Sequence, residues 1–238
     1  MKISSNSLFH FTSKKKYLKD ILENGFWPRY CREYGWGNLD FAIPMVCFCD
    51  IPLTQVLDHT STYGQYGIGL NRKWITSNRY ITPVHYIKNN SELFSHINEL
   101  LRKIEKKEQL SDDEYHCLMF AKKVSGNEKY RTKNIQKKLF YNEREWRYAS
   151  YKKLGLSPSD YIILIDKDEE FDANPPSLNT FNNRINIDTS DIQYILIPKE
   201  SNRKDMIKTI MGIKKFNNNQ KTELISKIIS IEQIKNDF

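Results

Sequence analysis

The sequence predicts a mixed α+β protein. Short apolar runs bounded by turn-forming residues, typical of strands, occur along the chain together with amphipathic stretches typical of helices. The chain has 238 residues, which fits one large domain or a domain with a substantial insertion. Its 13% aromatic content supplies enough large side chains for a hydrophobic core. We therefore expect a single domain over residues 1–238, with a helical insertion at about 88–138 and C-terminal helices at about 203–235.

The N-terminal part of the chain predicts a strand that enters a helix directly. Residues 8–12 form a short apolar run, and the apolar residues of 13–25 recur at helical spacing. Gly25 suits the position just after the end of this helix. His10 lies where the strand meets the helix, between two Phe residues, so a structural role and a ligand-binding role are both open for it.

The next part of the chain combines aromatic loops with one buried strand. Residues 26–43 are rich in Trp, Tyr, Arg and Gly and predict a loop that either covers a ligand or packs its rings onto the core. Residues 44–52 are an apolar run between two prolines and predict a buried strand. A short helix is expected around 54–60, and a strand or hairpin over 63–70. The glycines and tyrosines of this last segment would let the backbone approach a ligand closely.

The second half of the chain begins with a strand over 80–87 and continues into the helical insertion. Its two helices are indicated by an apolar stripe between Phe94 and Ile104 and by a capping box that starts at Ser111. Beyond the insertion, strands are predicted at 141–151, 161–165 and 192–198, a surface excursion at 167–191, and helices at 203–211 and 223–234.

The chain is strongly basic. A net charge of +8 and an isoelectric point near 9.1 favour a polyanionic partner such as nucleic acid, although they also fit lysines that serve only solubility. Between residues 122 and 138 the chain places seven basic residues against the single acid Glu128: Lys122, Lys123, Lys129, Arg131, Lys133, Lys137 and Lys138. This run either binds the phosphates of RNA or single-stranded DNA, or is a solvated helix end.

The cysteines and the N-terminus indicate a reducing compartment. Cys31, Cys47, Cys49 and Cys117 lack the C-x-x-C pairs and His clusters of a zinc site, so we expect free thiols and no metal. Residues 1–5 lack the apolar segment of a secretory signal, and no apolar run approaches membrane-spanning length. These features predict a cytoplasmic protein with no membrane partner.

Residues 141–148 contain two carboxylates, two guanidinium groups and three aromatic rings. If this stretch is a strand, Glu143, Glu145 and Arg147 share one face, where Arg147 relieves the repulsion between the two carboxylates. Such a face is either a solvated surface whose charges cancel or a site that holds a carboxylate ready for a developing positive charge.

Together these features resemble known families. The closer likeness is to the AbiGi type of bacterial abortive-infection, or phage-resistance, proteins, and it spans most of residues 8–200. It rests on Pro-Met-Val-Cys-Phe-Cys-Asp-Ile-Pro at 44–52, Tyr-Gly-Ile-Gly-Leu at 66–70 and Asn-Glu-Arg-Glu-Trp-Arg at 142–147. A more distant resemblance is to the ADP-ribosyltransferase superfamily, in particular DarT-like and CmdT-like toxins, through Phe-His-Phe-Thr at 9–12 and the later Glu-x-Glu.

The more distant resemblance implies an ADP-ribosyltransferase-like split β-sheet core and an activity that uses NAD as its substrate. Glu145 would stabilise the oxocarbenium-like centre that forms when the nicotinamide–ribose bond breaks, and Glu143 would orient or activate the acceptor. NAD binding would involve His10, Phe11, Thr12, Arg147, and Tyr63 and Tyr66, one of which would stack on the nicotinamide ring. If the acceptor is nucleic acid, it would be bound by Lys122, Lys123, Lys129, Arg131 and Lys133.

Two functions are therefore open. The first is an NAD-dependent ADP-ribosyltransferase toxin of phage defence, which modifies nucleic acid or a protein side chain. The second is a non-enzymatic interaction protein that keeps the fold and serves as an antitoxin-like partner of a defence system. The joint presence of His10 and the polar face of Glu143, Glu145 and Arg147 favours the enzyme. A nuclease is disfavoured because the chain lacks the carboxylate and His spacing of a catalytic metal site.

Overall fold

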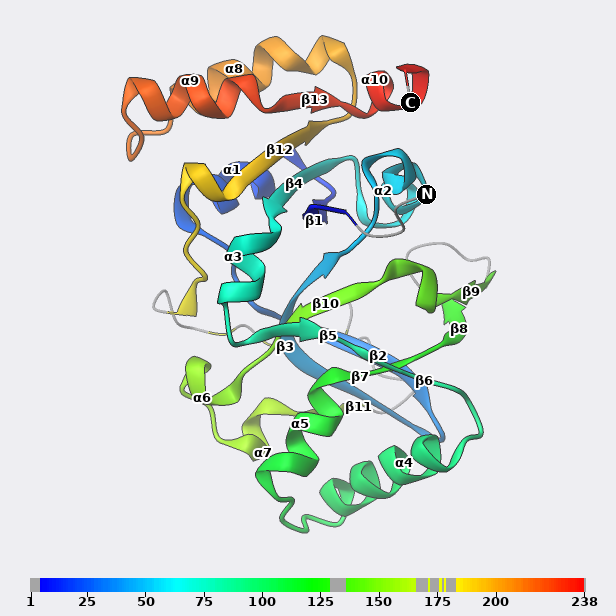
Figure 1. The fold of residues 1–238 in the computed structure, drawn as a ribbon. Coiled ribbons are helices and arrows are strands. Elements are labelled where there is room, and N and C mark those ends of the chain that lie inside the picture. The colour runs from blue at the N-terminus through cyan, green and yellow to red at the C-terminus, as the bar shows by residue number, and fades with distance from the viewer. Residues whose placement is uncertain are drawn as a thin grey trace. The chain divides into compact units, whose positions relative to one another are not determined.

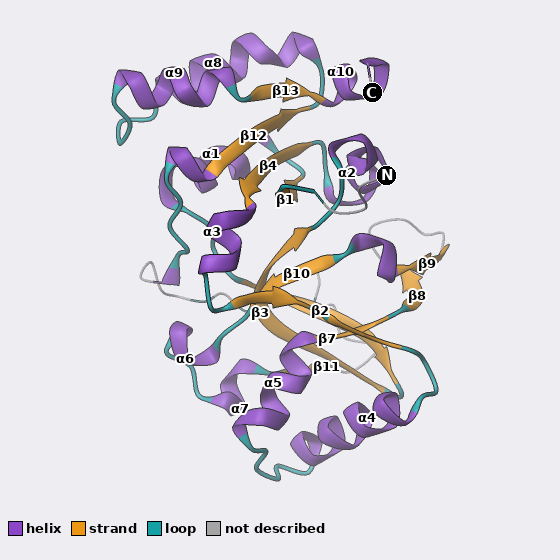
Figure 2. Ribbon diagram, in the orientation of Figure 1, coloured by secondary structure: helices purple, strands orange, loops and turns teal. Residues whose placement is uncertain are grey.

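The computed structural model describes residues 5–128, 136–165, 171, 176, 178 and 183–237. The chain divides into two compact units. We call them the terminal unit, formed by 1–27, 48–79 and 184–238, and the central unit, formed by 28–47 and 80–183. Figure 1 labels their helices and strands, and Figure 2 colours them by type. The expected single domain is therefore described as two units, each with a hydrophobic cluster of its own.

The terminal unit is built on strands in the order β13-β12-β4-β1. Their bounds are β1 Ser7–Thr12, β4 Tyr66–Asn71, β12 Ile192–Ile197 and β13 Ile228–Ser230. Strands β1 and β12 lie antiparallel to β4, and β13 runs parallel to β12. A Cβ atom on Gly69 of β4 would lie 2.8 Å from the ring of Phe9, so this glycine admits a neighbouring side chain of the unit.

Helices surround these strands. Their bounds are α1 Lys15–Asn24, α2 Val56–Tyr63, α3 Arg72–Ser77, α8 Arg203–Met211, α9 Asn218–Ser226 and α10 Ile231–Asp237. The hydrophobic cluster of this unit joins Phe9 and Phe11 of β1 to Leu196 of β12 and to Ile231 and Ile234 of α10. The last helix of the chain therefore packs into the same core as the first strand.

The central unit contains a long hairpin, formed by β2 (Arg29–Trp36) and β3 (Leu39–Cys49). The chain turns at two residues between Trp36 and Leu39, and the first of them, Gly37, has a φ of 62°, which favours glycine. Strand β10 (Glu145–Tyr148) lies between β3 and β5 (Ile81–Pro83), and β11 (Ile163–Ile165) pairs with β3. The hairpin thus places β2 and β3 beside the strand that carries the predicted glutamate.

Two smaller strand pairs and several helices complete this unit. The pairs are β6 (His85–Ile87) with β7 (Ala121–Lys123), which is parallel, and β8 (Ser125–Glu128) with β9 (Gln136–Leu139), which is antiparallel. The helices are α4 Glu92–Glu105, α5 Asp112–Phe120, α6 Tyr151–Leu154 and α7 Pro158–Tyr161. In the residues that the structure describes, no helix is both long and apolar enough to cross a lipid bilayer.

Several predicted elements are confirmed. The strand and helix at the N-terminus form as expected, and α8 spans the predicted residues. The capping box of α5 also forms, because the Ser111 hydroxyl accepts a hydrogen bond from the Glu114 amide while the Glu114 carboxylate accepts one from the Ser111 amide. These elements are determined by short-range patterns, and the structure reproduces them.

Other predictions are wrong. The expected loop over 26–43 is largely the β2–β3 hairpin, because its aromatic and apolar residues pack on the core of the central unit. The expected helix over 223–234 is interrupted by β13, because Ile228 and Ile229 pair with β12. The Ile-rich pattern of this segment suits a strand as well as a helix, and the available sheet edge decides between them.

Two predicted boundaries between residues 88 and 151 also differ from the structure. The insertion is helical only through α5, and the chain then continues as β7 and β8. The strand expected from residue 141 begins at Glu145, because Phe140–Glu143 forms a 3₁₀ turn and Arg144 adopts a φ of 46°. Glu143 therefore precedes the strand instead of belonging to it.

Gly25 gives a test of the terminal unit. Its φ is 81°, and a Cβ atom there would lie 2.4 Å from the carbonyl oxygen of Ile185. We expect Gly25→Ala to lower the free energy of unfolding by about 3 kcal/mol or more, through backbone strain and this clash. Gly155→Ala is the matched control, because Gly155 has a φ of 66° but no atom within 4 Å of the added methyl group. It should cost about 1 kcal/mol in urea denaturation, and equal losses for the two variants would contradict this account.

Candidate functional site

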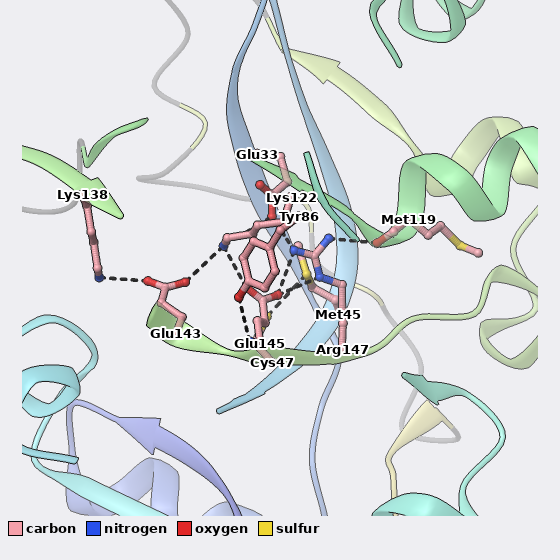
Figure 3. Close-up of polar contacts among 10 residues, drawn as sticks. All are labelled: Glu33, Met45, Cys47, Tyr86, Met119, Lys122, Lys138, Glu143, Glu145 and Arg147. Atoms are coloured by element: carbon pink, nitrogen blue, oxygen red, sulfur yellow. Dashed lines mark hydrogen bonds and ion pairs between the residues drawn. The ribbon is translucent and has the colours of Figure 1, made fainter. Parts of the chain in front are cut away.

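A group of buried charges lies in the central unit (Figure 3). It joins three carboxylates to three cations, contributed by β2, β7, β9, β10 and the 3₁₀ turn that precedes β10. We call this set the ion cluster, and its members are Glu33, Lys122, Lys138, Glu143, Glu145 and Arg147. The cluster contains Glu143, Glu145 and Arg147, but Glu143 does not share their strand face as predicted, because it lies in the 3₁₀ turn before β10 and pairs with Lys122 and Lys138.

Arg147 is the centre of the ion cluster. Its side chain is 0% exposed, and all three of its nitrogen atoms donate to protein acceptors. Nε donates to Glu145 at 2.8 Å, one terminal nitrogen donates to Glu33 at 2.6 Å, and the other donates to the carbonyl of Met119 at 2.9 Å. This one side chain thus links β10 to β2 and to the end of α5.

The lysines complete the charge balance. Nζ of Lys122 lies 2.8 Å from Glu145 and 3.5 Å from Glu143, and Nζ of Lys138 lies 2.9 Å from the other oxygen of Glu143. Lys122 also approaches Glu33 at 3.8 Å. Each carboxylate therefore faces at least one cation. Because the unpaired burial of any of these ions would be strongly unfavourable, the group is stable only as a whole.

The local backbone explains why two successive glutamates reach one cluster. Arg144 lies in the left-handed region, with a φ of 46°, and ends the 3₁₀ turn of Glu143 immediately before β10 begins at Glu145. The Glu145 amide donates to the hydroxyl of Tyr86 at 2.8 Å, which fixes the first residue of the strand. Burial raises the pKa of Tyr86, so its hydroxyl stays protonated while it accepts this bond.

The electrostatics of Glu145 follow from its surroundings. Burial by itself would raise the pKa of this carboxyl, but the charges of Arg147 and Lys122 outweigh burial and lower the pKa to about 2. In turn, burial would lower the pKa of Arg147, but the charges of Glu145 and Glu33 raise it. Glu145 and Arg147 are therefore both ionised at neutral pH.

Sulfur atoms line one side of the ion cluster. The thiols of Cys31 on β2 and Cys47 on β3 hydrogen-bond to each other, which lowers the pKa of Cys31 and raises that of Cys47. Sγ of Cys47 lies 3.5 Å from Sδ of Met45, and Figure 3 places both beside Glu145 and Arg147. Both cysteines are free thiols, as predicted. Among the described residues, no group of three or more His, Cys, Asp or Glu side chains is arranged to hold a metal ion.

This arrangement determines what Glu145 can do chemically. The carboxyl is ionised, as a carboxylate facing a developing cation must be. However, the residue is 4% exposed, one oxygen accepts from Arg147, and the other pairs with Lys122. A ligand would have to displace Lys122, whose side chain is 14% exposed, to reach this carboxylate. The predicted contact of Arg147 with NAD would require the buried packing around the guanidinium to open.

The other residues predicted to bind NAD lie in the terminal unit. His10, Phe11 and Thr12 are on β1, where Thr12 is opposite Tyr66. The ring of His10 meets Phe26 edge-on at 5.1 Å and lies 6.0 Å from Phe48. Tyr63 ends α2 and packs against the cluster that contains Phe11. Because His10 and Glu145 belong to different units, their predicted meeting in one cleft stays a prediction.

The predicted nucleic-acid residues fall into two groups. Lys129, Arg131 and Lys133 lie outside the described residues. Lys122 pairs with the glutamates, and Lys123 donates to the carbonyl of Gly35 at 3.2 Å. These two lysines belong to β7, so the start of the basic run is a strand instead of the expected helix end. Nucleic-acid binding by the run stays a prediction.

Glu33 and Tyr86 are site residues that the sequence does not indicate. Glu33 lies in the segment 26–43, for which the sequence predicts a loop. The signal that could have found it is the Gly37-Asn38 pair, a typical two-residue hairpin turn, which makes 29–36 a strand. Tyr86 carries no such signal, since its contact with the amide of Glu145 joins segments that are 59 residues apart.

Comparisons with known proteins agree with the motif resemblance. Residues 24–198 match the model of a family described as "Putative abortive phage resistance protein AbiGi, antitoxin". The "Abortive phage resistance protein AbiGi" of Lactococcus lactis subsp. cremoris is 30% identical over 229 residues, which cover 84% of this chain and 90% of that protein. No solved structure gives a significant match. The chain belongs to the AbiGi family of abortive phage resistance proteins.

Removing the central cation should destabilise the fold. We expect Arg147→Met to lower the free energy of unfolding by about 3–5 kcal/mol, because Glu33 and Glu145 would remain buried without their main partner. Lys152→Met is the control, since its 2.6 Å pair with Asp112 is just as short but well exposed. This control should leave the urea midpoint nearly unchanged. Similar urea midpoints for the two variants would show that the ion cluster contributes no more to the free energy of unfolding than an exposed ion pair does.

The low pKa of Glu145 predicts acid sensitivity. Because the folded-state pKa of about 2 lies below the ordinary value of 4.5, its contribution to stability is complete above about pH 4.5 and is lost as the pH falls toward about 2. Integrated over this interval, the loss is on the order of 3 kcal/mol. Denaturation midpoints measured between about pH 6 and about pH 3 should fall more steeply for the wild type than for Glu145→Gln. Parallel pH profiles would disprove the assignment.

Proposed function

We propose that this chain acts in abortive phage resistance as a non-enzymatic, antitoxin-like protein that binds and restrains a cognate toxin. The family to which it belongs carries the word antitoxin in its description. The ion cluster supports the same proposal, because its charged groups are paired with one another instead of facing a substrate. In this proposal the ion cluster stabilises the fold, and residues on the protein surface bind the partner.

The observation that carries this proposal is the environment of Glu145. Both of its oxygen atoms are occupied, by Arg147 and by Lys122, and the residue is buried. A carboxylate that stabilises an oxocarbenium-like centre must instead face the ligand. Partner binding needs no such exposed carboxylate.

An NAD-dependent ADP-ribosyltransferase is the second candidate, with an ADP-ribosyltransferase-like fold. One specific observation favours it: Glu143, Glu145 and Arg147 converge, and Glu145 is ionised at neutral pH. In this case Lys122 would swing away when NAD binds, and Glu143 would face the acceptor. The basic run that includes Lys129, Arg131 and Lys133 would then hold RNA or single-stranded DNA.

Expression in cells separates the two candidates. An antitoxin-like protein should be harmless when expressed alone, and removal of its gene from an otherwise intact resistance locus should arrest growth in the absence of phage. Supplying the chain from a plasmid should restore growth. An ADP-ribosyltransferase toxin should do the opposite, arresting growth when expressed alone and transferring labelled ADP-ribose from NAD to RNA, DNA or protein. Growth arrest by the chain alone, together with this transfer, would overturn the proposal.

Glu145→Gln separates a structural from a catalytic role for this residue. We expect a loss of about 3 kcal/mol in the free energy of unfolding, because Arg147 and Lys122 lose a charged partner in a buried site. Glu99→Gln in the exposed face of α4 is the control and should have almost no effect on the urea midpoint. A catalytic role predicts a different result, with unchanged stability and complete loss of NAD turnover.

A further inference from the structure

Helices α1 and α8 of the terminal unit are rich in lysine. The segments 14–24 and 203–216, which include these helices, contain nine Lys and Arg residues against the three acids Asp20, Glu23 and Asp205, which gives a net charge of +6. The structure describes every residue of both segments. Such an excess of positive charge attracts a polyanion when the cations lie together on the surface and are not paired within the protein.

The two helices lie beside each other. Nζ of Lys15, the first residue of α1, lies 2.6 Å from a carboxylate oxygen of Asp205 in the first turn of α8. Near the other end of both helices, burial lowers the pKa of Lys215, and the charges of Asp188 and Glu23 oppose this shift. Because Glu23 is in the last turn of α1 and Lys215 follows α8, the helices run in the same direction between these two contacts. Their lysines therefore belong to one surface.

The acids of this surface already have cations of their own. Besides Asp205, which pairs with α1, a carboxylate oxygen of Glu23 lies 3.5 Å from Nζ of Lys19. A carboxylate oxygen of Asp20 lies 2.8 Å from the guanidinium of Arg184. Apart from Lys215, the remaining lysines of the two segments are exposed and form no ion pair with any described residue. We call them the basic face: Lys14, Lys16, Lys204, Lys208 and Lys214.

Helical spacing places the lysines of α8 on its outer side. Lys204 and Lys208 are four residues apart and Met211 follows at a spacing of three, so these side chains share one face of the helix. The opposite face is held in the core by Met206 and Ile210, which are both buried. The lysines therefore point into solvent, where a ligand can reach them without any rearrangement of the fold.

We propose that the basic face binds the phosphate backbone of a nucleic-acid duplex. This inference goes beyond the proposed function, because it assigns to the terminal unit a ligand that neither the restraint of a toxin nor the use of NAD requires. The ammonium groups would contact phosphate oxygens, and each such contact releases condensed counterions into solution. Contacts of this kind depend on the charge of the backbone and not on the sequence of the bases.

The composition of the basic face favours nucleic acid over a protein partner. Lysine is depleted from the centres of protein interfaces, whereas aromatic side chains are enriched there. Among the described residues of the terminal unit, no aromatic side chain is strongly exposed, and Met211 is the one large apolar side chain that is. Single-stranded nucleic acid is bound by exposed rings on which its bases stack. The surface therefore fits a duplex, whose bases are already stacked on one another.

The test measures the binding of a labelled DNA duplex of arbitrary sequence by fluorescence anisotropy, between about 50 and about 200 mM salt. Five phosphate contacts predict a slope of about −4 to −5 for the logarithm of the affinity against the logarithm of the salt concentration. Lys204→Glu with Lys208→Glu should weaken binding at least about 10-fold at low salt and make this slope shallower by about 2. Lys14→Glu with Lys16→Glu should have the same effect, because these lysines belong to the same face.

The matched control is Lys88→Glu with Lys106→Glu. It changes the net charge by the same amount, at two exposed lysines of the central unit that form no ion pair within the described part of the chain. The control should bind as the wild type does, and all variants should keep the wild-type melting temperature. Absence of binding by the wild type at low salt would overturn the proposal. So would unchanged affinity in either variant of the basic face, or an equal loss in the control.

Two further probes identify the ligand. An RNA duplex of the same length distinguishes the two sources of a double-stranded backbone, and binding of either duplex supports the proposal. Tighter binding of single-stranded DNA of the same length would overturn the assignment of a duplex. Displacement of the DNA duplex by polyglutamate at equal charge concentration would overturn the assignment of nucleic acid and indicate an acidic protein instead.

Discussion

The structure of the central unit depends on one buried cation. Arg147 is completely enclosed, yet its nitrogen atoms find two carboxylates and a backbone carbonyl on three different elements. Burying a guanidinium group is costly, and the cost is offset only when every donor has a partner of the right geometry. The hairpin strand β2, the end of α5 and strand β10 must therefore take their observed places together.

The same ion pairs determine which groups of the central unit are open to a ligand. A carboxylate held by Arg147 and Lys122 is ionised but occupied, so it holds the fold and does not lie open to a ligand. The amide of Glu145 also donates to the hydroxyl of Tyr86, whose ring contacts that of the exposed Tyr141.

The terminal unit is organised by packing instead of charge. Gly67 and Gly69 leave space above β4 that aromatic and aliphatic side chains of β1 and β12 fill. His10 belongs to an aromatic group with Phe26 and Phe48, which gives its ring a packing role beside any role in binding. The parallel pairing of β13 with β12 then joins the C-terminal segment to this core. Motifs that are distinctive in sequence thus have direct roles in packing.

The sequence by itself determined the α+β class, the first strand and helix, α8, the cap of α5 and the placement of Glu145 and Arg147 on one face of a strand. These features depend on spacing within a few residues, where helix and strand periodicity are visible in the chain. Only the tertiary structure decided that Lys122 and Glu33 complete the cluster, because their partners lie 23 and 114 residues away and no local pattern records such contacts. It also decided that Ile228–Ser230 is a strand, since an apolar run takes the conformation that the neighbouring sheet edge offers.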